Sequence, residues 1–369
     1  MPVTKRFAWY LCSLMAILLC TSLSQAQVIK GKIIDTETGK PIPNANIYLN
    51  GTYLGTASDS TGNFTLTTGI KTNTPLVVSF VGYEMQTITN YADKILTIAL
   101  KRKLNDLKEV TITGFDGMSR EKEMKIFLTE FIGSTNKDCV ISNPDDIRFH
   151  YNNKTEVLTA TVDNPLLINN KKLGYKLTYF LANFSYAPLS TVYRGNYFFA
   201  EDTAGVGQEE IKNILKARDE AYFGSRMHFI RSLWSDELAK NNFEILQPII
   251  SFPNRAEYDD KQSKKLFYKD VVGIQNDSRF HDQKFIELKT EMINQRSKQK
   301  QETSQVSIIY KKNKHKEETS YLKQEKDYLG TLIDSNGFYG EGLGWNGDMG
   351  ISRVNKLLPF EFQPQKLLD

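Results

Sequence analysis

The sequence is poor in the residues that carry disulfides, thiol chemistry and metal sites. It has three cysteines and four histidines among 369 residues, and Cys12 and Cys20 lie within the first 26. If that segment is removed, Cys139 is the one cysteine left, which excludes an internal disulfide. Cys139 is followed by Val-Ile, so we expect a small, buried side chain and not a reactive thiol.

The histidines do not form a recognisable catalytic set. His315-Lys-Glu-Glu318 matches a His-x-x-Glu zinc pair, but His315 is the last histidine, and catalytic zinc needs three protein ligands. We therefore predict no metal site. His228 lies beside an apolar helical pattern, and we expect it at the surface.

The motifs of several enzyme classes are also missing. The chain has no Gly-x-Ser-x-Gly nucleophile turn, no phosphate-binding glycine loop before a lysine, and no dinucleotide-binding fingerprint. We predict no catalytic residue and no cofactor. A pair of carboxylates, as in glycosidases, leaves no such signature, so that kind of site stays open.

Neither sign of charge dominates. The formal net charge of +4 falls to +2 once Lys5 and Arg6 are removed with the first 26 residues. A nearly neutral protein is a poor match for a polyanion, so we predict no nucleic-acid partner. Residues 254–326 are rich in lysine and glutamine, which favours exposed, edge-type strands and loops.

The N-terminus has the pattern of a signal peptide. Lys5 and Arg6 precede the apolar run 7–19, and Ser24 and Ala26 are the small residues required before a cleavage site. We predict a signal peptide over residues 1–26, cleaved between Ala26 and Gln27. The protein is then exported, to the periplasm or in association with the outer membrane.

Two alternatives concern how the chain meets a membrane. Cys20 could carry a lipid, but Leu19 before it is large, so we favour plain cleavage. No later apolar run approaches the about 20 residues of a spanning helix. We therefore predict no transmembrane segment after signal cleavage. Removing 26 of 369 residues leaves 343, enough for about two domains.

Residues 28–112 predict a small β-sandwich. Short β-rich runs alternate with Gly, Pro, Asn and Asp, which is typical of this architecture. Asn50-Gly51 predicts a two-residue type I′ hairpin turn. The apolar run Leu76–Val81 predicts a central strand buried on both faces, with Phe80 in the core.

The same stretch resembles the carboxypeptidase-regulatory-like domain, a seven-stranded transthyretin-like and immunoglobulin-like β-sandwich. The resemblance is carried by Gly31-Lys-Ile-Ile-Asp35, Thr38-Gly-Lys-Pro-Ile-Pro-Asn-Ala45, Gly55-Thr-Ala-Ser-Asp59, Gly62-Asn-Phe64, Ser79-Phe-Val-Gly-Tyr83 and Leu107-Lys-Glu-Val-Thr-Ile112. It implies a non-catalytic module of Gram-negative envelope proteins, over residues 27–113. Such modules often precede the plug and barrel of TonB-dependent receptors. The 255 residues after Gly114 are too few for that barrel, so we expect the module without the receptor.

Residues 114–369 predict an α+β domain, so the whole fold is mainly β with α. Apolar spacing predicts helices over 118–131, 211–222 and 225–238, the last capped by Ser225. Residues 147–151 and 157–162 predict a hairpin, and residues 173–186 an aromatic, alternating strand. This region resembles the companion that follows the module in some envelope proteins, which implies no mechanism.

The sequence thus favours binding over catalysis. We expect a non-catalytic, exported envelope protein whose β-sandwich presents or docks a C-terminal domain that binds a partner protein or a glycan. The candidate binding residues are Tyr193 and Tyr197, in an aromatic strand, and Trp345, in a glycine-rich stretch that we expect to be a loop. The alternative is an envelope hydrolase, either carboxypeptidase-like or built on a carboxylate pair.

Overall fold

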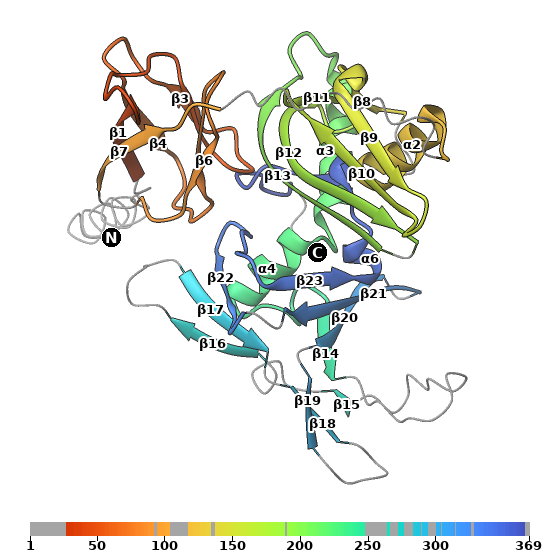
Figure 1. Ribbon diagram of the computed structural model, residues 1–369. Helices are drawn as coiled ribbons and strands as arrows, with labels where there is room; N and C mark the ends of the chain where they lie inside the picture. Colours follow the sequence, from red (N-terminus) through yellow and green to blue (C-terminus); the bar gives the residue numbers. More distant parts are fainter. Residues whose placement is uncertain are drawn as a thin grey trace, which may run out of the picture.

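Figure 1 shows a computed structural model in which the chain is mostly β-strand with a few helices. The residues it describes are 27–91, 94–103, 117–133, 137–188, 190–247, 264–265, 272–276, 283–288, 290–293, 300–303, 305–313, 315–325 and 328–365. The predicted signal segment 1–26, the predicted boundary between residues 113 and 114, and the motif at Leu107–Ile112 lie outside these ranges.

Seven strands within residues 27–100 form a two-sheet sandwich, as predicted. One sheet has the order β4-β1-β7, with β7 parallel to β1, and the other the order β3-β2-β5-β6. Ile33 and Phe64 from the first sheet and Ile47 and Val78 from the second belong to one hydrophobic cluster. The strands are β1 (Gln27–Asp35), β2 (Asn46–Leu49), β3 (Gly55–Ala57), β4 (Asn63–Thr68), β5 (Leu76–Ser79), β6 (Gln86–Ile88) and β7 (Ile95–Leu100).

The central strand is shorter than predicted. β5 lies between β2 and β6 and is buried along its whole length, but it ends at Ser79. Phe80 is only half-buried, and Val81 is 92% exposed. The chain turns here because Gly82 has a φ of +82° and the Tyr83 N–H donates to the Phe80 carbonyl at 3.1 Å. Phe80 thus packs against the sandwich cluster from its edge instead of lying fully inside it.

The hairpin between β2 and β3 has a five-residue loop instead of the predicted two-residue turn. The Leu49 N–H donates to the Leu54 carbonyl at 2.9 Å, and Gly51 has a positive φ of +74° while Asn50 does not. A type I′ turn would need positive φ at both positions. Residues 50–54, here called the docking loop, instead direct their backbone toward the second region.

A six-stranded sheet is the first part of the second region. Its order is β8-β11-β12-β10-β9, with β13 pairing along β12 on the remaining edge. The predicted hairpin is β9–β10, and the predicted aromatic strand is β12. The strands are β8 (Cys139–Ile141), β9 (Ile147–Asn152), β10 (Val157–Val162), β11 (Leu166–Asn170), β12 (Tyr175–Ala187) and β13 (Ser190–Glu201).

Helices complete the core of this sheet. Phe127 ends α2 (Arg120–Phe127), which continues into a π-turn (Leu128–Ile132), and both Phe127 and Phe131 are fully buried against β12. A short 3-10 turn (Pro144–Asp146) leads into β9. α3 (Gln208–Tyr222) contributes Ala217 and Tyr222 to the same cluster.

A third hydrophobic cluster lies beyond α3. Helix α4 (Arg226–Trp234) begins at Ser225, whose side chain accepts from the His228 N–H at 3.2 Å, so the predicted cap is confirmed. α4 packs on the sheet β15-β14-β20-β21-β23 and on β16-β17-β22. These strands are β14 (Phe243–Gln247), β15 (Lys264–Lys265), β16 (Val272–Asn276), β17 (Gln283–Leu288), β20 (Gln305–Asn313), β21 (Lys316–Gln324), β22 (Thr331–Asp334) and β23 (Leu343–Asn346), beside the separate pair β18 (Thr290–Ile293) and β19 (Lys300–Thr303).

Within the lysine-rich segment 254–326, strand β20 is less exposed than predicted. β20 lies between β14 and β21, and its residues 306–310 are all buried. The chain then returns to the six-stranded sheet through α6 (Gly347–Gly350) and a 3-10 turn (Val354–Lys356), where Val354, Leu358 and Phe362 join the cluster of α3 and β12. In Figure 1 the orange sandwich lies beside the yellow-green sheet, with the cyan and blue strands below.

Candidate functional site

Trp345 lies in a strand and not in the predicted loop. It is in β23, opposite Leu322 of β21, and its ring meets those of Phe229 at 5.9 Å and Tyr339 at 5.5 Å. Its indole Nε1 is buried and has no hydrogen-bond partner in the part of the chain that is described. The ring is therefore half-buried against the third cluster, and a ligand contact by Trp345 stays a prediction.

Tyr193 and Tyr197 also take part in internal packing. Tyr197 stacks on Tyr179 with a centroid distance of 5.4 Å and an interplanar angle of 2°. Tyr193 meets Phe131 edge-on at 5.2 Å. Burial raises the pKa of both hydroxyl groups. A binding role for these two residues likewise stays a prediction.

The three predicted residues do converge, around Arg226 at the start of α4. Its guanidinium lies 5.8 Å from the Trp345 ring centroid, and its positive charge opposes the rise that burial causes in the pKa of Tyr193 and Tyr197. Arg226 Nε donates to the Met349 carbonyl at 2.9 Å. Arg226 therefore connects α4 to β23 and α6 by internal contacts.

The docking loop extends the six-stranded sheet. The Gly51 N–H donates to the Tyr197 carbonyl at 2.7 Å, and the Phe199 N–H donates to the Thr52 carbonyl at 2.9 Å. Both bonds lie on the edge of β13 that faces away from β12. An unpaired strand edge is a template for pairing, and here part of it is covered by the sandwich.

Tyr53 anchors the docking loop. Its ring packs edge-on against Tyr175 at 5.9 Å and Phe199 at 6.2 Å. Its N–H donates to Glu361 Oε1 at 2.9 Å, and its hydroxyl donates to Glu201 Oε2 at 3.2 Å. One aromatic residue of the sandwich thus contacts β12, β13 and the C-terminal segment.

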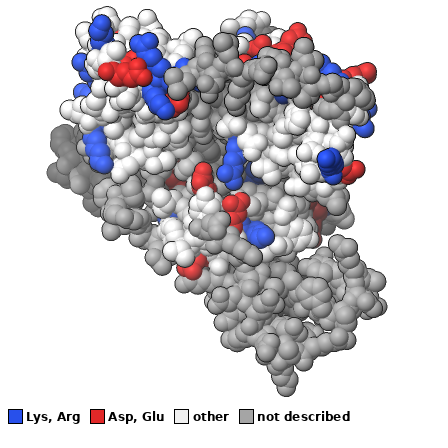
Figure 2. Space-filling model, in the orientation of Figure 1, with Lys and Arg blue, Asp and Glu red and all other residues white. Residues whose placement is uncertain are grey.

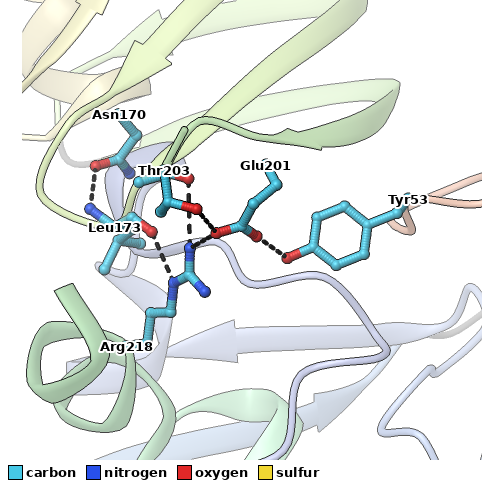
Figure 3. Close-up of polar contacts among 7 residues, drawn as sticks. Tyr53, Asn170, Leu173, Glu201, Thr203 and Arg218 are labelled. Carbon is cyan, nitrogen blue, oxygen red and sulfur yellow. Dashed lines mark hydrogen bonds and ion pairs between the residues drawn. The ribbon is translucent and has the colours of Figure 1, made fainter. Parts of the chain in front are cut away.

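A buried arginine continues this network, as Figure 3 shows. Arg218 of α3 donates from Nη2 to Glu201 Oε1 at 2.6 Å and from Nε to the Leu173 carbonyl at 2.7 Å. Thr203 donates its hydroxyl to the same carboxylate at 3.0 Å, and the guanidinium lies 3.9 Å from the Tyr175 ring centroid. The network links α3 to the docking loop through Glu201.

Asp334 forms a second link between the regions. It is fully buried and accepts from the Thr72 hydroxyl at 3.0 Å and the Asn73 N–H at 3.1 Å, both from the sandwich. The N–H groups of Asn336 and Phe338 donate to its other oxygen. Burial raises the pKa of Asp334 although these four donors favour the ionised form.

A groove runs between α3 and the start of β8. Two cavities of about 390 and 360 Å³ share Asp138, Lys172, Ala217 and Glu220 among their lining residues. Cys139 lies at its inner side, and the prediction of a free, buried cysteine is confirmed. Burial raises the pKa of this thiol to about 12.

His315 is exposed in the β20–β21 hairpin, and Glu318 pairs with Lys312 at 3.3 Å. Within the described ranges, no three His, Cys, Asp or Glu side chains group closely enough to hold a metal ion. Across those ranges, no helix combines the length and the apolar character needed to cross a bilayer.

Comparison with known proteins assigns the first part of the chain. Its sequence matches the family model of the CarboxypepD_reg-like domain over residues 29–112. Residues 29–112 are a CarboxypepD_reg-like domain. Over part of its length the chain is also similar to TonB-dependent receptors. TonB-dependent receptor SusC of Bacteroides thetaiotaomicron is 35% identical over 103 residues, which cover 28% of this chain and 10% of the receptor.

A second receptor gives the same result. TonB-dependent receptor P39 of Formosa agariphila is 31% identical over 113 residues, which cover 31% of this chain and 11% of the receptor. The chain thus spans about a tenth of the length of the curated relatives it matches. Among solved structures, a 9R-lipoxygenase from Cyanothece PCC8801 aligns with 58% of this chain and 49% of its own, at 12% identity and a TM-score of 0.18. A score this low does not indicate a shared fold.

The turn motifs of the CarboxypepD_reg-like domain stabilise its own fold. Asp35 accepts from the Tyr83 hydroxyl at 2.7 Å and from Arg102 Nε at 2.9 Å, and its other oxygen accepts from the Glu37 and Thr38 N–H groups. The Tyr83 hydrogen bond and these further donors hold the pKa of Asp35 well below its usual range. The Asp35 side chain therefore connects the first turn to the segments that follow β5 and β7.

Sequence reasoning missed the residues that join the two regions. Glu201, Arg218 and Asp334 each also bond to a residue far along the chain, respectively Tyr53, Leu173 and Thr72. No local pattern indicates those partners. Tyr53 had one usable signal, since an aromatic residue in a short hairpin loop often has a partner to pack on.

Proposed function

We propose that this chain is an exported, non-catalytic protein of the Gram-negative cell envelope, in which the CarboxypepD_reg-like domain docks onto a partner-binding region. Its proposed parts are a signal peptide (1–26), this domain (27–113) and the region 114–369. Similarity of about a third of the chain to parts of TonB-dependent receptors supports the envelope location. The domain itself implies no catalysis.

The observation that carries this proposal is the pairing of the docking loop with β13. Two backbone hydrogen bonds extend the sheet, and Tyr53 is inserted between β12, β13 and the C-terminal segment. Backbone pairing at a sheet edge fixes register and orientation. The domain therefore acts as a structural part of the region it docks on and sets the surface offered to a partner.

A protein partner fits the described surface better than a glycan. Glycan sites rely on exposed aromatic faces for stacking against sugar rings, whereas Tyr193, Tyr197 and Trp345 pack against other rings inside the molecule. On the face shown in Figure 2, acidic and basic side chains are interspersed without an extended patch of one sign. Mixed charge of this kind suits a polypeptide partner.

The hydrolase alternative would have to use the carboxylates of the groove. Asp138, Glu210 and Glu220 line it, and all three are exposed. Paired catalytic carboxylates owe their separate acid and base roles to unlike surroundings, typically with one of them buried among apolar groups. The geometry favours binding over hydrolysis.

The test is recovery of a partner from solubilised envelope by the mature protein, residues 27–369. We expect a defined partner with the wild type and reduced recovery with Tyr53→Ala, because that change loosens the docking. Val81→Ala, at an exposed turn of the same domain, is the control and should not differ from wild type. Recovery of no partner, or hydrolysis of envelope material that Asp138→Asn abolishes, would overturn the proposal.

The intact mass of the exported protein tests the proposed signal-peptide cleavage. Cleavage after Ala26 makes Gln27 the first residue, and β1 begins at that residue. A mass that includes a lipid on Cys20 would contradict plain cleavage.

A further inference from the structure

The two cavities beside α3 share four lining residues and together follow the helix. On the helix side their lining residues are Glu210, Asn213, Ile214, Ala217, Glu220 and Ala221, together with Lys216. Spacings of three and four place the first six on one face of the helix. From residue 210 to residue 221 the helix rises about 16 Å, which equals about five residues of extended chain.

Part of the groove lining consists of small or apolar side chains, beside the amides of Asn170 and Asn355. Ala217 and Ala221 lie on α3, with Leu173 and Cys139 opposite. Alanines four residues apart leave room for a polypeptide backbone to approach the helix. A groove of this length and lining suits an extended segment better than a single small ion.

Lysines dominate the wall opposite α3. Lys171, Lys172, Lys312 and Lys356 line that wall, together with one carboxylate, Asp138. Lys312 pairs with Glu318 at 3.3 Å. The ammonium groups of Lys171, Lys172 and Lys356 have no ion pair within the described residues, so they are available to a ligand.

The helix wall has the opposite tendency. Its charged residues are Glu210, Glu220 and Lys216. Acidic side chains of a ligand would be repelled on this side and attracted on the other. The groove therefore distinguishes its two sides by charge.

We propose that this groove binds an extended segment of the partner protein in which alternate residues are acidic. Side chains of an extended chain point alternately to opposite sides, so every second residue meets the lysine wall while the residues between face α3. The absence of aromatic side chains among the described lining residues disfavours a sugar. The inference rests on the proposed function and names the chemistry of the partner.

Two labelled peptides of equal composition test the pattern on the mature chain. Glu-Ser-Glu-Ser-Glu-Ser places its carboxylates on one side when extended, and Glu-Glu-Glu-Ser-Ser-Ser does not. By fluorescence anisotropy we expect the alternating peptide to bind about fivefold more tightly or better, with an affinity that falls as salt is added. Equal affinity for the two peptides would overturn the proposal.

Variants locate the binding. The double variant K172E/K356E should weaken the alternating peptide about tenfold or more, whereas K30E/K32E, two exposed lysines on β1, changes the net charge equally and should have no effect. Asn213→Trp should block the groove from an exposed position, and Lys212→Trp on the far side of α3 is its control. Equal weakening by the control pairs would reduce the result to bulk charge and refute the site.

Two further outcomes are decisive. If inorganic phosphate displaces the peptide at equal concentration, the lysines form a small-anion site and the proposal fails. If K172E/K356E still recovers the partner from envelope, the groove is not the binding site, although the proposed function stands. If the wild type recovers no partner, the proposed function fails, whatever the peptides do.

Discussion

At the scale of single residues, His228 shows how a sequence pattern can mislead. The sequence placed it at the surface, but it is 2% exposed, and its ring contacts those of Tyr222, Phe243 and Tyr310. Its Nδ1 accepts from the Gly224 N–H at 3.2 Å. Burial lowers the pKa of His228 from 6.5 to about 4, against the opposing effect of Asn241.

This burial predicts a loss of stability in mild acid. Above pH 6.5 both folded and unfolded chains hold His228 neutral. As the pH falls from 6.5 toward 4, the unfolded chain takes up the proton first, so the free energy of unfolding should fall by about 2 kcal/mol at pH 5 from this group. Urea titrations give the free energy of unfolding at pH 7.5 and at pH 5. The decrease between these two pH values should be smaller by that amount in His228→Gln than in the wild type. Exposed His150→Gln is the control, and equal differences in both variants would contradict the account.

Trp345 gives a second prediction at this scale. Because its ring packs on Phe229 and Tyr339, Trp345→Ala should lower the free energy of unfolding by about 2–4 kcal/mol. Ile351→Ala, which is 63% exposed, should change it by less than about 0.5 kcal/mol. Thermal unfolding of both variants decides. An unchanged melting temperature with lost partner recovery would instead make Trp345 a contact residue.

At the scale of elements, the docking loop depends on one glycine. A Cβ on Gly51 would lie 2.6 Å from the Phe360 ring, and its φ is +74°. Gly39 has a similar φ of +66° but open space around it. Gly51→Ala should therefore cost about 1–2 kcal/mol more than Gly39→Ala, measured by urea unfolding.

A double variant checks the cause. Removing the ring with Phe360→Ala should make the Gly51→Ala change cost little more than Gly39→Ala. If the cost persists without the ring, the contact with Phe360 is not its source.

At the scale of the whole molecule, the CarboxypepD_reg-like domain has its own hydrophobic core. It is nevertheless hydrogen-bonded to the region that follows it. Its hydrophobic cluster draws only on residues 29–100. We predict that a fragment of residues 27–113 folds alone and binds a separate fragment of residues 114–369 in solution. Tyr53→Ala in the first fragment should weaken this association about tenfold or more, and Val81→Ala should not. Calorimetric titration measures both, and an unfolded first fragment would contradict the prediction.

The sequence by itself determined the elements that depend on near neighbours. The sandwich, the Ser225 cap and the β9–β10 hairpin follow from alternation, turn residues and capping, all of which act within a few residues. The end of strand β5 did not follow, since the apolar run continues to Val81 while the strand stops at Ser79. The form of the docking loop did not follow either, because it pairs with the edge of β13. Only the tertiary structure decided that Trp345 lies in a strand, that His228 is buried, and that Tyr53, Glu201 and Arg218 meet. These contacts join residues more than a hundred positions apart in the case of Tyr53 and Glu201, and no local pattern encodes a partner at that separation.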